Sequence, residues 1–475
     1  MSDAHGPAAE GTQASPPWAW ITSGIAIAAI VTMGALLWRQ RAESPKPPSA
    51  VPTQIAPLTS THDSSLPALS HDGRFLAYVR TDDSRASSIW LRQLATDSNV
   101  RLVAAIPGVS ILAVAVTPDN RSIDFVRDSV KGSSKLELWR VPVRGGKPRK
   151  LVDRVTSAPG WAPDGRRMAY VAPVGIDAST RQLIVASADG SQPRVVATRT
   201  LPLRYNTLAL TGRPDLRPVW LADGRTVALV ASDDGKGLGC LQVVGVDMAT
   251  GVERVLHSLP ENRGSGARSS MALTADGQAL LLNLQSDASG PAQVLHLRMA
   301  NGHITALTAD PSTYAGVSVA GNVVASSRSE AQSTLWLAES DGKHTRQVGH
   351  EMPVRIETLG WMGNERVMYE AALTDGTGVW SVDLATGESM LRTEQGPQPA
   401  RTGDRNKTPD GRGLAYVDAG GTNIWIQPLD GSPPRRLTQF DDQIITSFSW
   451  SPDGSQLALV RARETSDIVL LKGTP

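Results

Sequence analysis

Short runs in which apolar and polar residues alternate fill the chain from about residue 51 to its end. Residues 444–460 show this pattern most clearly, because the runs 444–450 and 456–460 flank the tetrapeptide Ser-Pro-Asp-Gly at 451–454. Alternation with a period of two is typical of a half-buried β-strand, in which successive side chains point to opposite faces. Proline, aspartate and glycine together supply the backbone angles of a tight turn. We therefore predict a β-hairpin over 444–460.

The same hairpin signal recurs along the chain at a nearly constant spacing. Asp-Gly, or an equivalent turn pair, begins at positions 72, 119, 164, 223, 276, 321, 363, 410 and 453, so that successive turns are 47, 45, 59, 53, 45, 42, 47 and 43 residues apart. A period of about 40–45 residues with four strands per repeat is the signature of a β-propeller blade. The pattern predicts an all-β fold. We expect a single closed β-propeller of nine four-stranded blades, or of eight if the degenerate units and long insertions are discounted.

Each unit also carries signals for a third and a fourth strand. The third strand is marked by triplets such as Ile89-Trp90-Leu91, and a polar turn such as Asp430-Gly431 leads into the fourth. Tryptophan recurs before the first turn and within the third strand, which favours packing between blades. The last unit reaches Pro475 without a fourth strand, and Gln54–Thr59 resembles the one that is missing. We therefore predict that this N-terminal strand completes the final blade.

The first 52 residues follow a different pattern. Residues 18–38 are apolar almost throughout, and 21 residues at 1.5 Å each give a helix of about 31 Å, close to one hydrocarbon core. Trp18, Trp20 and Trp38 would anchor its ends at the two membrane interfaces. The sequence thus predicts one transmembrane helix, and a cleaved signal peptide is the alternative. The predicted domains are a disordered tail (1–17), the transmembrane helix (18–38), a Pro-rich linker (39–52) and the propeller (53–475).

Composition and charge narrow the possible partners. The chain has 47 Lys and Arg against 46 Asp and Glu, so no excess of positive charge favours nucleic acid. Cys240 is the one cysteine, which excludes an intramolecular disulfide and a cysteine-based metal cluster. Arg39, Arg41 and Lys46 follow the predicted span and no basic residue precedes it. The positive-inside rule therefore favours a cytoplasmic C-terminal part.

The motifs that usually carry catalysis or bind metals are missing from the sequence. It has no Gly-x-Ser-x-Gly nucleophile elbow, no glycine loop leading into a helix, and no histidines at metal-ligand spacing. Asp233-Asp234 and Asp441-Asp442 could hold Ca²⁺ between blades, although acidic loop residues usually face water. We therefore predict no catalytic, cofactor-binding or metal-binding residue. The long insertions at 201–218 and 260–270 are candidates for recognition, with neutral insertions as the alternative.

The repeats resemble the TolB-like, WD-repeat-like propeller repeats of bacterial envelope proteins. The matching stretches are Asn423–Gly431, Pro434–Thr438, Phe448–Gly454 and Thr465–Leu471. More narrowly, span and repeats together resemble the C-terminal propeller of bacterial membrane-spanning serine/threonine kinases and related one-span regulators. The resemblance covers most of residues 51–475, but nothing in the chain resembles a kinase domain or a winged helix. It implies a periplasmic propeller, against the orientation that the three basic residues favour.

The leading functional hypothesis is a single-pass protein of the bacterial cytoplasmic membrane whose propeller is a non-catalytic sensing or protein-interaction module. Its partner would be a protein or a small-molecule ligand at the propeller face, an expectation that follows from the resemblance. The alternative from another class is an enzyme of the glycosidase or lyase type with carboxylates in the propeller channel. The first strands at 66–69, 113–116 and 271–274 carry no paired acids for such a site. A third hypothesis is the remnant of a receptor kinase or transcriptional regulator.

Overall fold

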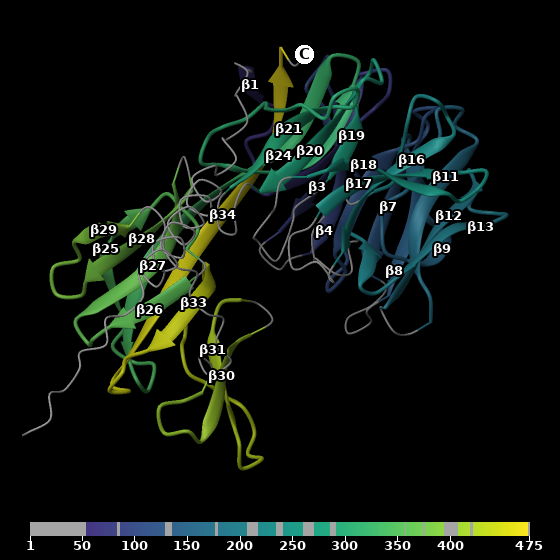
Figure 1. The fold of residues 1–475 in the computed structure, drawn as a ribbon. Helices are drawn as coiled ribbons and strands as arrows, with labels where there is room; N and C mark the ends of the chain where they lie inside the picture. Colours follow the sequence, from purple (N-terminus) through teal and green to yellow (C-terminus); the bar gives the residue numbers. More distant parts are fainter. Residues whose placement is uncertain are drawn as a thin grey trace, which may run out of the picture. The chain divides into compact units, whose positions relative to one another are not determined.

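The computed structural model describes residues 54–82, 86–128, 135–175, 179–206, 217–233, 241–259, 270–285, 291–356, 358–373, 376–393, 407–418 and 421–473. Every named element in these ranges is a β-strand (Figure 1). None of the described residues forms a helix that is long and apolar enough to cross a membrane. The predicted tail, transmembrane helix and linker, with Trp18, Trp20 and Trp38, lie outside the described residues, so these remain predictions.

The predicted turns are present in all nine positions. The residue that closes each turn has a positive φ, between +56° and +71°, at Gly73, Asn120, Gly165, Gly224, Gly277, Gly321, Gly363, Gly411 and Gly454. In the last of these, the Gly454 N–H donates to the Ser451 carbonyl over 2.9 Å, as a tight turn requires. Strands pair in antiparallel register on both sides of eight of these turns, and at Gly411 a single antiparallel bridge joins Lys407 to Leu414 of β30. The repeat read from the sequence is therefore confirmed.

Five sheets follow the predicted repeat in chain order, and we number them after their units. Sheet 4 has a fifth strand, because the first residues of the insertion at 201–218 form β14 and pair with β16. The strands are β2 (Ser64–Leu69), β3 (Phe75–Thr81), β4 (Ser87–Gln93) and β5 (Asn99–Val103) in sheet 1; β6 (Ile111–Val116), β7 (Ser122–Asp128), β8 (Leu136–Pro142) and β9 (Arg149–Val155) in sheet 2; β10 (Gly160–Trp161), β11 (Arg167–Pro173), β12 (Thr180–Ser187) and β13 (Arg194–Thr200) in sheet 3; β14 (Leu203–Tyr205), β15 (Val219–Trp220), β16 (Thr226–Asp233), β17 (Leu241–Asp247) and β18 (Glu253–Ser258) in sheet 4; and β19 (Met271–Leu273), β20 (Ala279–Gln285), β21 (Ala292–Arg298) and β22 (Ile304–Ala306) in sheet 5.

The remaining strands form three sheets. One contains six strands from predicted units six and nine, and we call it the shared sheet: β1 (Gln54–Pro57), β23 (Thr313–Ala320), β24 (Val323–Glu339), β25 (Arg346–Met352), β33 (Ile444–Trp450) and β34 (Gln456–Lys472). Sheet 7 contains β26 (Thr358–Met362), β27 (Arg366–Leu373), β28 (Gly376–Asp383) and β29 (Ser389–Thr393). Sheet 8 contains β30 (Gly413–Val417), β31 (Ile424–Pro428) and β32 (Arg435–Arg436).

The shared sheet differs from the predicted arrangement. The sequence predicts that 323–339 and 456–472 each fold back as a second and a third strand of one blade. Instead, both segments are continuous strands of 17 residues, and they pair with each other from Val324↔Leu471 to Glu339↔Gln456. Figure 1 shows β34, in yellow, extended along this sheet. Units six and nine thus exchange their third strands, because the same alternating pattern can pair within one hairpin or between two.

The predicted pairing of the N-terminal strand is confirmed. β1 pairs with the end of β34, with Ile55 opposite Leu471. The Leu58 N–H donates to the Ile468 carbonyl, and the Asp467 carboxylate accepts from the Thr59 hydroxyl over 2.7 Å. The all-β repeat of mostly four-stranded sheets is therefore confirmed, whereas closure of all the units into one ring of eight or nine blades is not shown.

The hydrophobic core consists of separate clusters between neighbouring sheets. Successive clusters join sheets 1 and 2, 2 and 3, 3 and 4, and 4 and 5. Two further clusters lie on opposite faces of the shared sheet and join β23, β24 and β34 to sheet 5 and to sheet 1. The other half of the shared sheet packs against sheet 7 on one face and sheet 8 on the other. Each sheet therefore depends on its neighbours for burial.

Most tryptophans of the repeats lie in these clusters, as the sequence predicts. Trp220 is buried between sheets 3 and 4, and its Nε1 donates to the Gly160 carbonyl over 3.1 Å. Trp90, Trp139, Trp161, Trp336, Trp361, Trp380 and Trp450 pack against the edges of other clusters. Trp425 on β31 belongs to none of the described clusters.

We expect substitution of one inter-sheet glycine to destabilise the fold. Gly251 has a φ of +75°, and a Cβ at this position would collide with the Val196 carbonyl of sheet 3. Gly251→Ala therefore has a backbone strain of about 1–2 kcal/mol and a packing cost of about 1–3 kcal/mol. The control is Gly73→Ala, where φ is +67° and no atom lies within 4 Å, so only the first cost applies. Urea unfolding of the two variants measures the difference, and equal losses would contradict the collision.

The turn aspartates predict a loss of stability in acid. Hydroxyl donors at 2.6 Å, from Thr274 to Asp276, Thr408 to Asp410 and Ser451 to Asp453, hold the pKa of each carboxyl below its ordinary value. A lowered folded-state pKa stabilises the fold above the unfolded value of about 3.9, and this contribution is lost as pH falls below it. The melting temperature should therefore fall between pH 4 and pH 2, less steeply in Thr274→Val. If the melting temperature of Thr274→Val falls with pH as steeply as that of the wild-type protein, the hydrogen bond from Thr274 to Asp276 does not cause the loss of stability.

Candidate functional site

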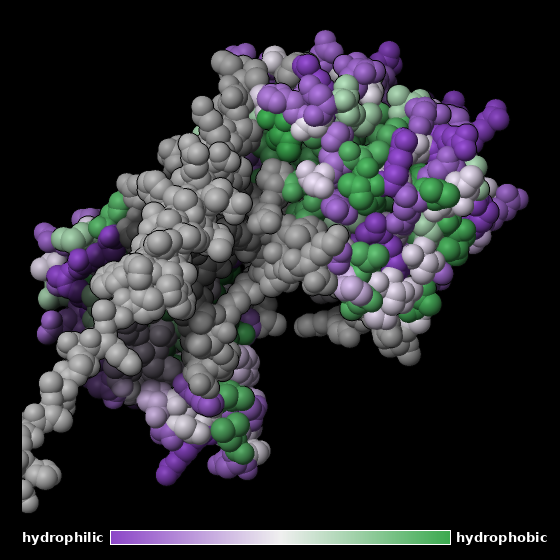
Figure 2. Space-filling view, viewed as in Figure 1, coloured by the Kyte–Doolittle hydropathy of each residue, from purple (hydrophilic) through white to green (hydrophobic). Residues whose placement is uncertain are grey.

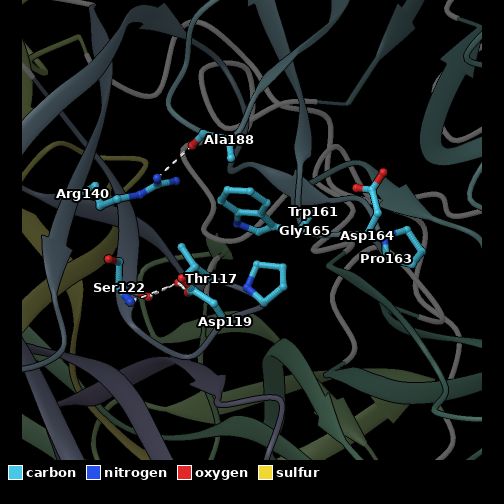
Figure 3. Close-up of a pocket in the computed structure, with 10 residues that line it drawn as sticks. Thr117, Asp119, Ser122, Arg140, Trp161, Pro163, Asp164, Gly165 and Ala188 are labelled. Atoms are coloured by element: carbon cyan, nitrogen blue, oxygen red, sulfur yellow. Dashed lines mark hydrogen bonds between the residues drawn. The ribbon is translucent and has the colours of Figure 1, made fainter.

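A pocket of about 380 Å³ lies between sheets 2 and 3, at the side where their first turns lie (Figure 3). The turn between β6 and β7 supplies one wall, and the turn between β10 and β11 supplies the other. The floor comes from Arg140 on β8 and from the chain after β12. The lining residues are Thr117, Pro118, Asp119, Ser122, Arg140, Trp161, Pro163, Asp164, Gly165 and Ala188. Two adjacent sheets therefore build one concave site from the same repeated turn.

The two turns that form the walls pack directly on each other. A Cβ at Gly165, whose φ is +66°, would lie 3.3 Å from the Cβ of Pro118. This separation is tight for carbon atoms, so glycine permits the turn of sheet 3 to approach the turn of sheet 2. The equivalent contact joins Gly454 to Pro409 in another pair of sheets. The close approach is thus a property of the repeat, while the pocket beside it is formed by Arg140 and Trp161.

Arg140 is fixed by a buried ion pair below the pocket. Its Nε and one terminal nitrogen donate to the two carboxylate oxygens of Asp124 over 2.6 and 3.0 Å, and the other terminal nitrogen donates to the Ala188 carbonyl over 2.8 Å. Asp124 is fully buried, and burial raises its pKa while the hydrogen bonds from Arg140 oppose that rise. A bidentate pair of this kind fixes the guanidinium plane. Arg140 therefore serves as a rigid part of the floor.

Trp161 supplies the aromatic surface of the pocket. The guanidinium carbon of Arg140 lies 5.2 Å from the centroid of the Trp161 ring, within the range of a cation–π contact. Figure 3 shows Arg140 directed towards this ring and the Ala188 carbonyl, while the carboxylate of Asp164 points away from them. The ring is therefore held from below by a cation and bordered by the turn prolines.

Asp119 is held on the opposite wall by its own turn. Its carboxylate accepts from the Thr117 hydroxyl over 2.6 Å and from the Arg121 N–H over 3.0 Å. Burial favours the neutral acid, but these hydrogen bonds outweigh it and keep the pKa of Asp119 below its ordinary value. Asp119 is therefore a fixed negative charge at neutral pH.

The lining residues are suited to binding and carry no evident catalytic machinery. No histidine or cysteine is among them, and the Thr117 hydroxyl donates to the Asp119 carboxylate. Because the pKa of Asp119 is below its ordinary value, this carboxylate is a weak base for activating a nucleophile. Among the residues that the structure describes, no group of three or more His, Cys, Asp and Glu is placed to hold a metal ion. The arrangement supports recognition of a side chain or small group.

The candidate recognition loops and Ca²⁺ ligands that the sequence predicts are not among the residues that line this pocket. Residues 207–216 and 260–269 of the two insertions lie outside the described residues, as does Asp234. Asp442, a candidate for Ca²⁺, forms an ion pair with Arg461. The pocket was missed although both of its turns were identified, because only the packing of sheet 2 on sheet 3 brings 117–122 beside 161–165.

Comparison with known proteins gives solved structures only. No protein-family model and no curated protein matches the chain. Similar solved structures include TolB from Acinetobacter baumannii, with a TM-score of 0.37, 15% identity and 69% of this chain covered. A TolB described as putative, from Agrobacterium tumefaciens, has a TM-score of 0.37, 16% identity and 80% of this chain covered. The β-propeller domain of the Trilobed protease from Pyrococcus furiosus has a TM-score of 0.34, 12% identity and 72% of this chain covered.

The chain spans 65% of the Acinetobacter TolB chain, 98% of the Agrobacterium chain and 100% of the Pyrococcus domain. Two of these structures are TolB proteins and the third is the propeller domain of a protease. The fold of this chain is shown by its own repeated antiparallel sheets.

Proposed function

We propose that this chain is a membrane-anchored β-propeller that binds a partner protein without catalysing a reaction, and that the pocket between sheets 2 and 3 is a point of contact. The observation that carries the proposal is the preformed pocket. Its charged groups are already held by Asp124, Ala188 and Thr117, so a partner does not have to order them on binding.

The chemistry of the pocket favours a basic side chain of the partner. Trp161, Pro118 and Pro163 offer aromatic and apolar surface, while the Asp119 carboxylate contributes a negative charge. The charge of Arg140 is compensated by Asp124. A lysine or arginine that stacks on the ring and faces the Asp119 carboxylate fits this combination.

Site-specific photocrosslinking in cells tests the pocket. A photoreactive phenylalanine analogue at position 164, whose side chain is 44% exposed, should give adducts with a discrete partner. The control carries the same analogue at position 255, where Val255 is 52% exposed on the outer strand β18. We expect the position-164 adduct to be lost when Trp161 is also replaced by alanine. Equal adducts at both positions, or adducts insensitive to Trp161→Ala, would contradict a specific pocket.

Membrane anchoring is supported by the apolar run 18–38 with Trp18, Trp20 and Trp38 at its ends. We place the propeller on the periplasmic side, as the resemblance to envelope proteins implies. Protease added to intact spheroplasts should remove a C-terminal tag and degrade the propeller. Protection until lysis would reverse the orientation, in agreement with Arg39, Arg41 and Lys46.

A further inference from the structure

Sheet 8 has a covered face and an uncovered face. Ala415, Ile424 and Ile426 point into the cluster shared with β24 and β34 and are at most 3% exposed. The opposite face carries Leu414 and Tyr416, which are 39% and 38% exposed, and the half-buried Trp425, which is opposite Tyr416 in the register. No other described sheet packs there. Figure 2 shows hydrophobic residues at the surface in the region that β30 and β31 occupy in Figure 1.

Sheet 7 is also covered on one face only. Leu359, Val367 and Tyr369 point into the cluster with the shared sheet. Met362 and Met390 belong to the other face and are 40% and 55% exposed. Every other described sheet contributes residues to clusters on both of its faces. Sheets 7 and 8 are therefore the two ends of a stack of three, with the shared sheet between them.

The turns between third and fourth strands show which neighbour each end lacks. In four turns, a Cβ on the turn glycine would meet the fourth strand of the sheet before it, or the chain just beyond that strand: Gly190 meets Leu151, Gly251 meets Val196, Gly302 meets His257 and Gly342 meets Leu437. Gly387 of sheet 7 likewise meets Gly349 of the shared sheet. Gly431 of sheet 8 has no atom within 4 Å.

The Gly145-Gly146 turn of sheet 2 also contacts no preceding sheet, although sheet 2 is covered on both faces. An empty turn alone therefore does not mark an uncovered face, and in sheet 8 the empty Gly431 turn locates the strand that is missing beside an uncovered face. Sheet 8 lacks a sheet before it, and sheet 7 lacks a sheet after it. Because they flank opposite faces of the shared sheet, their uncovered faces cannot meet within one copy.

We propose that a second copy of this chain covers both faces, with sheet 7 of each copy packed on sheet 8 of the other. A two-fold axis makes this contact twice, so no uncovered face remains. The number of sheets supports this pairing. Sheets 1 to 5 and the half of the shared sheet that contains β23 pack in succession, and this half also packs on sheet 1, so six sheets cover one another. The other half of the shared sheet packs between sheets 7 and 8, which gives a stack of three. In the proposed dimer, the two copies together supply two such stacks, which again makes six sheets.

The chemistry of the two faces is complementary. Methionine side chains on sheet 7 are flexible and favour contacts with aromatic rings, which sheet 8 offers in Tyr416 and Trp425. By analogy with Gly251 over Val196, the bulged residue of its fourth strand, Gly431 of one copy should lie over Arg392 of the other, the bulged residue of β29 next to Leu391. The proposal is independent of any ligand at the pocket between sheets 2 and 3.

Crosslinking between two differently tagged full-length chains tests the proposal. In a Cys240→Ser background, one chain carries Leu391→Cys and the other Ser432→Cys, both at exposed positions, and the two are co-expressed and purified in detergent. A short bis-maleimide should join the two tags at least tenfold more than in the control pair Val195→Cys and Val255→Cys, which are exposed on fourth strands elsewhere. Tyr416→Arg should abolish the product and halve the molar mass measured by light scattering.

Two results would overturn the proposal. If a chain carrying both cysteines crosslinks only internally and remains a monomer, sheets 7 and 8 meet within one copy, as in a single ring with closed hairpins. If no crosslink forms and wild-type protein has the mass of one chain, these faces await a different partner. Circular dichroism of each variant confirms that it is folded before the comparison is made.

Discussion

Replacing Asp124 with asparagine is expected to lower the free energy of unfolding by about 3–5 kcal/mol, because it leaves Arg140 in a buried site without its counter-charge. The carboxylate is fully buried, and the Arg140 side chain is 12% exposed. Asparagine keeps one acceptor oxygen but places an N–H₂ donor where the second oxygen accepts from Arg140, and solvent cannot replace the hydrogen bond that is lost. Urea unfolding, followed by tryptophan fluorescence, measures the change.

The control for Asp124→Asn is an exposed ion pair. Asp97 accepts from Arg92 over 2.9 Å and is 73% exposed, so Asp97→Asn should cost about 0–1 kcal/mol. A double variant, Asp124→Leu with Arg140→Met, should recover much of the loss, because it removes both buried charges and keeps apolar volume. If Asp124→Asn and Asp97→Asn have equal effects, the buried pair does not organise sheet 2 as described.

We expect Trp220→Ala to lower the free energy of unfolding by about 3–5 kcal/mol, because it opens a cavity between sheets 3 and 4. Trp220 is 4% exposed and packs among residues of both sheets. The guanidinium of Arg167 lies 5.0 Å from its ring centroid, and its Nε1 donates to the Gly160 carbonyl. The substitution thus removes packing, a cation–π contact and a hydrogen bond. Chemical denaturation gives the magnitude.

Two further variants separate these contributions. Trp220→Phe keeps most of the apolar volume but removes the donor to Gly160, so a smaller loss of about 1–3 kcal/mol is expected. Trp425→Ala, on the uncovered face of sheet 8, should have little effect on unfolding when the protein is dilute enough to be monomeric. A large loss for Trp425→Ala under that condition would mean that this face is covered within one copy.

Local sequence was sufficient for the repeat and its turns. The nine turn positions, the strands beside them and the pairing of β1 with β34 all follow from signals within a few residues. Proline and glycine restrict or extend the backbone angles, and alternation selects the strand, so each hairpin is specified where it lies. The exchange in the shared sheet was not predictable in this way. Alternation assigns a face to each side chain of 323–339 and 456–472 but does not select a partner strand.

The residues of the pocket also divide into features that local sequence predicts and contacts that only the tertiary structure creates. Sequence alone determined that 117–122 and 161–165 are turns and that Arg140 and Trp161 lie on strands beside them. It did not determine that Arg140 reaches Asp124, Ala188 and the face of Trp161, because these contacts join residues up to 48 positions apart in two sheets. What the sequence determined by itself is local backbone geometry and the side of each strand that is buried. Apart from the pairing of β1 with β34, which the missing fourth strand of the last unit indicated, the tertiary structure decided which strand and which sheet meet, because apolar faces with one repeated pattern are chemically almost equivalent partners until the rest of the fold positions them.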